Sequence, residues 1–129
     1  MITALYASLL MLLIIWLTFE VIKQRRSGQV AYADGGVKAL QIARSAHGNA
    51  IETIPISLIL MILLEFNDGS IYLLHLAGLL LLIGRILHGT GILKENMAKR
   101  KFGMIITLLS QVMLVICNLI YLPYGQLVG

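Results

Sequence analysis

The residues best placed to do chemistry in this sequence are charged side chains within long apolar runs. Arg85 occurs in LLLLIGRILHGTG and Glu52 in RSAHGNAIETIP. An arginine at the centre of a membrane helix costs about 2.5–3.5 kcal/mol on insertion scales, so it should face protein, water or a partner. We therefore expect Glu52 and Arg85 to form an ion pair. Such a pair could simply fix two helices together, or it could form part of a ligand site.

Further polar residues share one face of the helix that carries Glu52. At about 100° per residue, five of them fall within about 80° of one another and form a stripe that runs toward the charged end of the helix. The stripe comprises Lys38, Gln41, Ser45, Asn49 and Glu52. Arg44 and His47 fall off this stripe, and we expect them to serve helix packing, subunit contacts or headgroup contacts.

The other two groups of polar residues lie on the next two helices. Arg85 and His88 are three residues apart and therefore share a helix face, beside glycines that permit close helix approach. The segment AKRKF supplies Lys99, Arg100 and Lys101. These cations could set topology and contact anionic lipids, and they would also place positive charge at the mouth of the stripe.

The elements that must position these residues are membrane helices. The chain has 129 residues, of which 59% are hydrophobic and 12% charged, and its mean hydropathy is +0.91. Soluble domains have about 45–50% apolar and about 25% charged residues. Four stretches approach the roughly 20 apolar residues that a span needs. They lie at about 2–22, 46–64, 71–93 and 102–122, which predicts an all-α, single-domain, up-down four-helix bundle.

Charge distribution predicts the orientation of this bundle. Nine of the ten lysines and arginines lie in or beside the two connections that share a side: Lys23, Arg25, Arg26, Lys38, Arg44, Lys94, Lys99, Arg100 and Lys101. The positive-inside rule makes that side cytoplasmic and puts both termini on the outer side of the membrane. Because the basic residues sit beside hydrophobic runs without interleaved aromatics, we expect no nucleic-acid partner. With the single Cys117, neither a disulfide nor a cysteine metal site is available, and we expect no metal.

Three motifs resemble the MAPEG superfamily, the membrane-associated proteins in eicosanoid and glutathione metabolism, and in particular its small bacterial members. AHGNAIETIP is similar to the second-helix pattern and matches it at His47, Asn49, Glu52 and Pro55. GRILHG resembles the third-helix Gly-Arg-x-x-His of the prostaglandin E synthase branch. RKFGMIIT resembles the bacterial start of helix four. With the four-span layout, the resemblance covers almost the whole chain.

The resemblance to the small bacterial members implies a location in a bacterial inner membrane, with the termini in the periplasm. It also implies a homotrimer that binds glutathione between neighbouring subunits near the cytoplasmic side. Asn49, Glu52 and Arg85 would hold the tripeptide, together with His88, Gln41 and Lys38 of the polar faces. Arg100 would activate or stabilise the thiolate, with Lys101 as the alternative in the alignment. Two positions depart from the family pattern: Ser45 replaces an arginine and Ile92 replaces a tyrosine.

Two functions follow from these observations. The first is a glutathione-dependent transferase or peroxidase, in which a lipophilic electrophile or lipid hydroperoxide arrives through the membrane lipid. The second is a non-catalytic membrane protein of the same fold that binds a lipid or an anionic small molecule. A transporter has little support, because the sequence shows no inverted repeat and few intramembrane charges.

Overall fold

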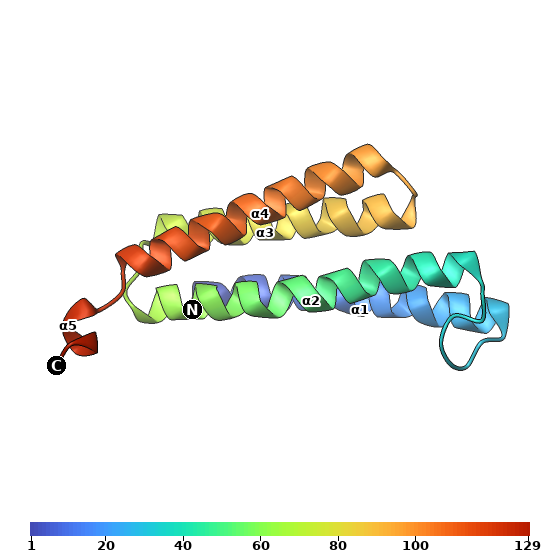
Figure 1. Ribbon diagram of the computed structural model, residues 1–129, viewed down its shortest axis with the longest axis horizontal. Coiled ribbons are helices and arrows are strands. Elements are labelled where there is room, and N and C mark those ends of the chain that lie inside the picture. Colours follow the sequence, from blue (N-terminus) through green and yellow to red (C-terminus); the bar gives the residue numbers. More distant parts are fainter.

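The computed structural model describes all residues from 1 to 129 and contains only helices (Figure 1). The helices are α1 (Ile2–Gly28), α2 (Lys38–Phe66), α3 (Ile71–Leu93), α4 (Met97–Ile120) and the short α5 (Tyr124–Leu127). The first four are long and apolar enough to cross a membrane. The first three predicted spans lie within α1, α2 and α3, and the fourth overlaps α4. The prediction of an all-α protein with four spanning helices is therefore confirmed, whereas α5 was not predicted.

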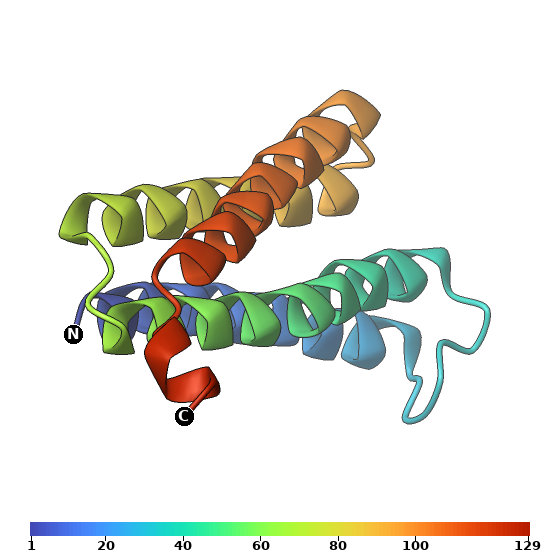
Figure 2. The same cartoon turned by 60° about the vertical axis from the view of Figure 1, so that its left-hand side comes forward.

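The four long helices form two antiparallel pairs, α1 with α2 and α3 with α4 (Figures 1 and 2). The α1–α2 and α3–α4 connections lie at one end of the molecule, and both termini lie with the α2–α3 turn at the other (Figure 1). Helices α2 and α3 contact each other and both of the outer helices, whereas α1 and α4 do not contact. The two central helices thus carry the residues that all the others surround.

Helix ends follow local backbone chemistry. Helix α1 ends with Gly28. The next residue, Gln29, has a left-handed conformation (φ 53°), and its amide donates to the carbonyls of Arg25 and Arg26. Helix α4 begins after Asn96, whose side chain accepts a hydrogen bond from the amide of Lys99 at 3.0 Å. Helix α2 is the longest at 29 residues and continues through Pro55 without a break.

A carboxylate at the end of α2 holds the first turn of α1. Glu65 accepts hydrogen bonds from the amides of Ile2 at 2.6 Å and Thr3 at 2.9 Å. The first amides of a helix have no partners within the helix, and the N-terminal end of the helix dipole favours a negative charge. This contact joins α1 to α2 at the end of the molecule that carries the termini.

Glycines bring α3 and α4 into close contact. A Cβ added at Gly84 would lie 2.6 Å from the hydroxyl of Thr107, and one added at Gly103 would overlap the backbone of His88. A Cβ added at Gly91 would lie 2.5 Å from the backbone nitrogen of Arg100. Small residues of this kind let helices pack closely in a membrane, where association depends on close contacts and hydrogen bonds. The start of α4 is therefore fixed directly against the polar end of α3.

Polar side chains of α4 add hydrogen bonds to its neighbours deeper in the bundle. Ser110 donates to the carbonyl of Ala77 in α3 at 2.8 Å, and the Gln111 amide donates to the Ser57 hydroxyl in α2 at 3.0 Å. Interhelical hydrogen bonds in membranes contribute about 0.6 kcal/mol each on average. They orient α4 against both central helices.

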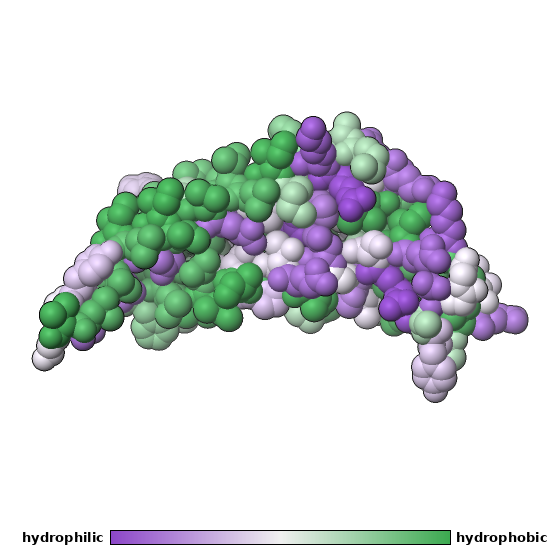
Figure 3. Space-filling view, viewed as in Figure 1, coloured by the Kyte–Doolittle hydropathy of each residue, from purple (hydrophilic) through white to green (hydrophobic).

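Most apolar side chains face outward. Only 29 of the 129 residues are buried, so the bundle leaves a large apolar surface for lipid or for other copies of the chain. Figure 3 shows hydrophobic residues covering the half that carries the termini, while hydrophilic residues gather toward the end with the two basic connections. The surface is therefore divided along the length of the helices rather than around them.

The close approach of α3 and α4 predicts a contrast between two glycines. Gly103→Ala should destabilise the protein by about 1–3 kcal/mol, because the new methyl group overlaps the backbone of His88. Gly48→Ala is the matched control: no atom lies within 4 Å of its added Cβ, and alanine favours the helix by up to about 1 kcal/mol. Thermal unfolding of the detergent-solubilised variants measures the difference. Equal melting temperatures would mean that the spacing of α3 and α4 does not depend on this glycine.

Candidate functional site

The guanidinium of Arg85 joins three helices. Arg85 is 2% exposed and is the largest fully buried side chain in the protein. Its Nη1 donates to the Asn49 side-chain oxygen in α2 at 2.6 Å, and its Nε donates to the Thr107 hydroxyl in α4 at 3.1 Å. Thr107 in turn donates to the carbonyl of Gly103 at 2.8 Å. Nη2 is buried and has no hydrogen-bond partner.

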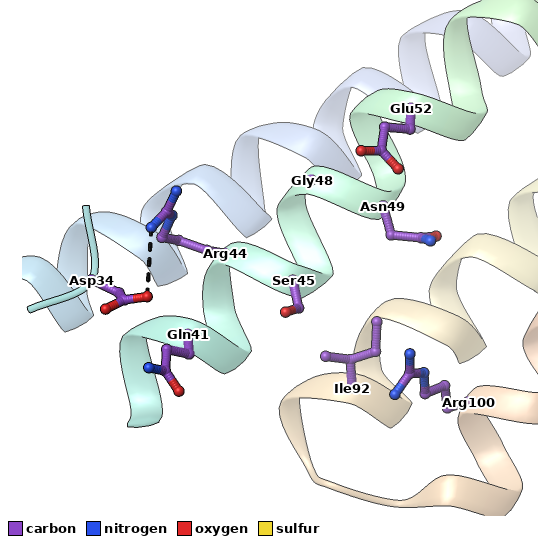
Figure 4. A pocket seen from close by; sticks show the side chains of 9 residues that line it. All are labelled: Asp34, Gln41, Arg44, Ser45, Gly48, Asn49, Glu52, Ile92 and Arg100. Carbon is purple, nitrogen blue, oxygen red and sulfur yellow. Dashed lines mark ion pairs between the residues drawn. The ribbon is translucent and has the colours of Figure 1, made fainter. Parts of the chain in front are cut away.

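These contacts correct the prediction that Arg85 pairs with Glu52. No ion pair joins the two within the chain, and the α2 side chain that bonds Arg85 is Asn49. Glu52 lies on the next turn, about 60° round α2 from Asn49 at 100° per residue. Asn49 is half-buried and extends toward α3, whereas Glu52 is exposed and its carboxylate turns the other way in Figure 4. The angular positions of Asn49 and Glu52 around α2 therefore decide which side chain reaches the guanidinium.

His88, one turn along α3 from Arg85, faces the start of α4. Its Nδ1 lies 3.0 Å from the backbone carbonyl of Arg100. A carbonyl oxygen only accepts, so Nδ1 carries the proton and donates it, which leaves Nε2 of the neutral ring as an acceptor. Nε2 is buried without a partner. The contact fixes the orientation of the ring and joins α3 to the backbone of the first turn of α4.

A polar pocket of about 470 Å³ opens beside these residues, between α2, the α1–α2 connection and the start of α4 (Figure 4). Eight of its nine lining residues are polar, charged or glycine, and they are Asp34, Gln41, Arg44, Ser45, Gly48, Asn49, Glu52 and Arg100; the ninth is Ile92. Neither Glu52 nor the guanidinium of Arg100 has a hydrogen bond or ion pair within the chain. Both charges are thus free to meet a ligand.

A second pocket of about 490 Å³ has the opposite character. Its hydrophobic lining residues are Met97, Ala98, Met104 and Ile105 of α4, and its remaining residues are Asn49, His88, Arg100 and Lys101. Asn49 and Arg100 line both pockets. A hydrophilic molecule in the first pocket and an apolar one in the second would therefore both contact these two residues.

The sequence-predicted site residues occupy four kinds of position. Gln41, Asn49, Glu52 and Arg100 line the polar pocket. His88 and Lys101 line the apolar pocket, and Arg85 lies behind Asn49. Lys38 lines neither pocket; its ammonium instead forms an ion pair of 3.2 Å with Glu95 of the α3–α4 connection.

Sequence reasoning missed one pocket residue, Asp34, and one partner of Arg85, Thr107, and it misplaced a third residue, Arg44. Asp34 belongs to a connection, for which helix periodicity gives no position. Thr107 carries no charge, although it falls inside the RKFGMIIT motif. Arg44 was expected to lie off the polar stripe, yet its long side chain reaches back into the pocket, where Nη1 lies 3.9 Å from the Asp34 carboxylate.

Comparison with known proteins agrees with this architecture. The model of the MAPEG family matches residues 3–120 of the chain. The inner membrane protein YecN of Escherichia coli strain K12 is 40% identical over 124 residues, which cover 96% of this chain and 95% of that protein. The protein of the same name from Escherichia coli O6:H1 strain CFT073 matches with the same identity and coverage. No solved structure matches the chain.

Three findings support one assignment: the four spanning helices, the family match over nearly the whole length, and a relative that aligns over nearly all of both chains. The chain is a membrane protein that belongs to the MAPEG family.

Proposed function

We propose that this protein binds glutathione in the polar pocket and uses its thiolate against a lipophilic electrophile or a lipid hydroperoxide in the apolar pocket. The observation that carries the proposal is that the two pockets share Asn49 and Arg100 as a common wall. The hydrophilic tripeptide enters from the charged end of the molecule. The lipophilic substrate enters from the surrounding bilayer.

Arg100 supplies the electrostatic activation in this proposal. A free thiol has a pKa of about 8.5, and a nearby cation lowers it so that the nucleophilic thiolate forms at neutral pH. The guanidinium of Arg100 has no partner within the chain, which leaves its charge available for the sulfur. Ile92 lines the polar pocket where related enzymes carry a tyrosine, and its side chain cannot donate a hydrogen bond. Stabilisation of the thiolate therefore falls to Arg100.

The chemistry balances with glutathione as the only added reactant. In a transfer reaction, the thiol proton leaves to water, the sulfur forms a bond to the electrophilic carbon, and the displaced electron pair leaves with the departing group. In a peroxidase reaction, two glutathione molecules supply two electrons. The O–O bond breaks, and the products are an alcohol, water and glutathione disulfide.

We also propose that the protein acts as a homotrimer with the basic connections in the cytoplasm. The exposed carboxylate of Glu52 supports assembly, because a charged group within a membrane span is costly when lipid can reach it, and a neighbouring copy would close the pocket that Glu52 lines against lipid. The asymmetry of lysine and arginine supports the orientation. The inner-membrane relative supports a location in the bacterial inner membrane.

One observation favours a second candidate, a non-catalytic protein that holds a lipid or an anionic small molecule in the same pockets. Ile92 removes a thiol-stabilising hydroxyl from the pocket, so binding could persist without chemistry. The two candidates differ in the role of Arg100. An enzyme requires its charge for turnover, whereas a binding protein keeps its biological role when Arg100 is replaced.

Glutathione should raise the melting temperature of the detergent-solubilised wild type, because a ligand that binds only the folded state stabilises it. The shift at a fixed concentration should shrink to near zero in Glu52→Gln, which removes a charge that lines the pocket. Glu20→Gln, which alters a carboxylate on α1 outside that pocket, should keep the full shift. A wild type whose melting temperature does not respond to millimolar glutathione would remove the proposed ligand.

Arg100→Ala should lower kcat/KM for a chromogenic electrophile by tenfold or more, and it should abolish the ultraviolet thiolate absorbance that appears when glutathione binds. The loss reflects a thiol pKa that returns toward about 8.5. Lys94→Ala is the control, because Lys94 is also an exposed cation near this end but lines neither pocket. If wild-type protein binds glutathione with neither thiolate absorbance nor turnover, the non-catalytic candidate takes its place.

A further inference from the structure

The charges around the polar pocket are balanced rather than uniformly positive. Asp34 and Glu52 contribute two carboxylates, and Arg44 and Arg100 contribute two guanidinium groups. A purely anionic group, such as a lipid phosphate, would meet both carboxylates at close quarters. A ligand that carries both signs of charge fits the lining better, because each of its charges has an opposite partner.

The carboxylate of Asp34 is held at the mouth of this pocket. Its Oδ1 accepts a hydrogen bond from the amide of Gly36 at 2.8 Å, and this leaves Oδ2 directed at Arg44. Arg25 at the end of α1 donates to the carbonyl of Ala33 at 2.8 Å and so fixes the residue that precedes Asp34. The position of the acidic group is therefore set by the connection before any ligand binds.

The pair formed by Asp34 and Arg44 is a loose one. Arg44 Nη1 and Asp34 Oδ2 are 3.9 Å apart, whereas a direct charge-assisted hydrogen bond measures about 2.7–2.9 Å. The Arg44 and Asp34 side chains are 46% and 37% exposed, respectively. Each group therefore keeps hydrogen-bonding capacity that the other does not use, and a ligand can reach both (Figure 4).

We propose that Asp34 and Arg44 together bind the α-amino-acid end of the ligand. Asp34 accepts hydrogen bonds from the α-ammonium group, and Arg44 donates to the adjacent α-carboxylate. This inference rests on the proposed binding of glutathione and assigns its γ-glutamyl end to the α1–α2 connection. The cysteinyl thiol then extends toward Arg100 and the shared wall. Neither Asp34 nor Arg44 matches a position that the family resemblance supplies.

The proposal and the simplest alternative predict opposite effects on ligand affinity when the charge of Asp34 is removed. If Asp34 merely occupied Arg44 as an internal competitor, an anionic ligand would have to displace it, and neutralising Asp34 would tighten binding. If Asp34 binds the ammonium group, the same change weakens binding. The substitution Asp34→Asn suits this comparison, because the asparagine side-chain oxygen can still accept from Gly36 while the charge is lost.

Isothermal titration of the full-length protein in detergent tests the inference with two peptides: glutathione, and its analogue glutaryl-cysteinylglycine, which lacks the α-amino group. Asp34→Asn should weaken glutathione binding about tenfold and change the affinity for the analogue less than twofold. Arg44→Gln should weaken both peptides, because both retain a carboxylate at this end. Asp68→Asn, which alters an exposed carboxylate at the opposite end of the molecule, should leave both affinities unchanged.

The outcomes separate the two proposals. If wild-type protein fails to bind glutathione, the proposed function falls and this inference falls with it. If wild type binds glutathione but Asp34→Asn tightens binding, or weakens both peptides equally, only the inference is overturned. Melting temperatures of the variants without ligand confirm that each is folded before its affinities are compared.

Discussion

Burial of the Arg85 guanidinium constrains the rest of this structure. A charged group away from water is tolerated only when hydrogen-bond partners surround it, and removing one partner of a buried charge costs several kcal/mol. Asn49 and Thr107 supply those partners from α2 and α4, so one side chain sets the relative positions of three helices. The guanidinium carries no ion pair in the chain, and its Nη2 remains unpartnered beside the pockets. Arg85 is thus both a fixed point of the bundle and an unused hydrogen-bond donor.

The close packing of α3 and α4 places a second charged residue, Arg100, near the buried Arg85 contacts. Gly103 and Gly91 bring the start of α4 against the end of α3, and the His88 ring holds the backbone of Arg100 there. Arg100 consequently projects its side chain at the junction of a polar and an apolar pocket. The proposed reaction of a water-soluble thiol with a lipophilic substrate would use this junction, with the charge of Arg100 beside both pockets.

Much of this arrangement could be predicted from the sequence. Apolar runs located the four spanning helices, and the family motifs named Asn49, Glu52, Arg85 and Arg100, all of which lie in or beside the pockets. Pairing of Glu52 with Arg85 was predicted wrongly, since opposite charge is a poor guide when a neutral amide on the preceding turn faces the guanidinium more directly. The positions of Asp34 and Arg44 were out of reach for a different reason. Helix periodicity places Cα atoms, but it says nothing about where a connection folds back or how far a long side chain reaches.

The most direct test of the central claim is a double-mutant cycle on the Asn49–Arg85 contact. The free energy of unfolding in detergent is measured for wild type, Asn49→Ala, Arg85→Met and the double variant. A buried, charge-assisted contact between helices predicts a coupling energy of about 1 kcal/mol or more, so the double variant should lose less stability than the two single losses combined. Additive losses, equal within about 0.3–0.5 kcal/mol, would contradict the claim that this contact holds the central helices together.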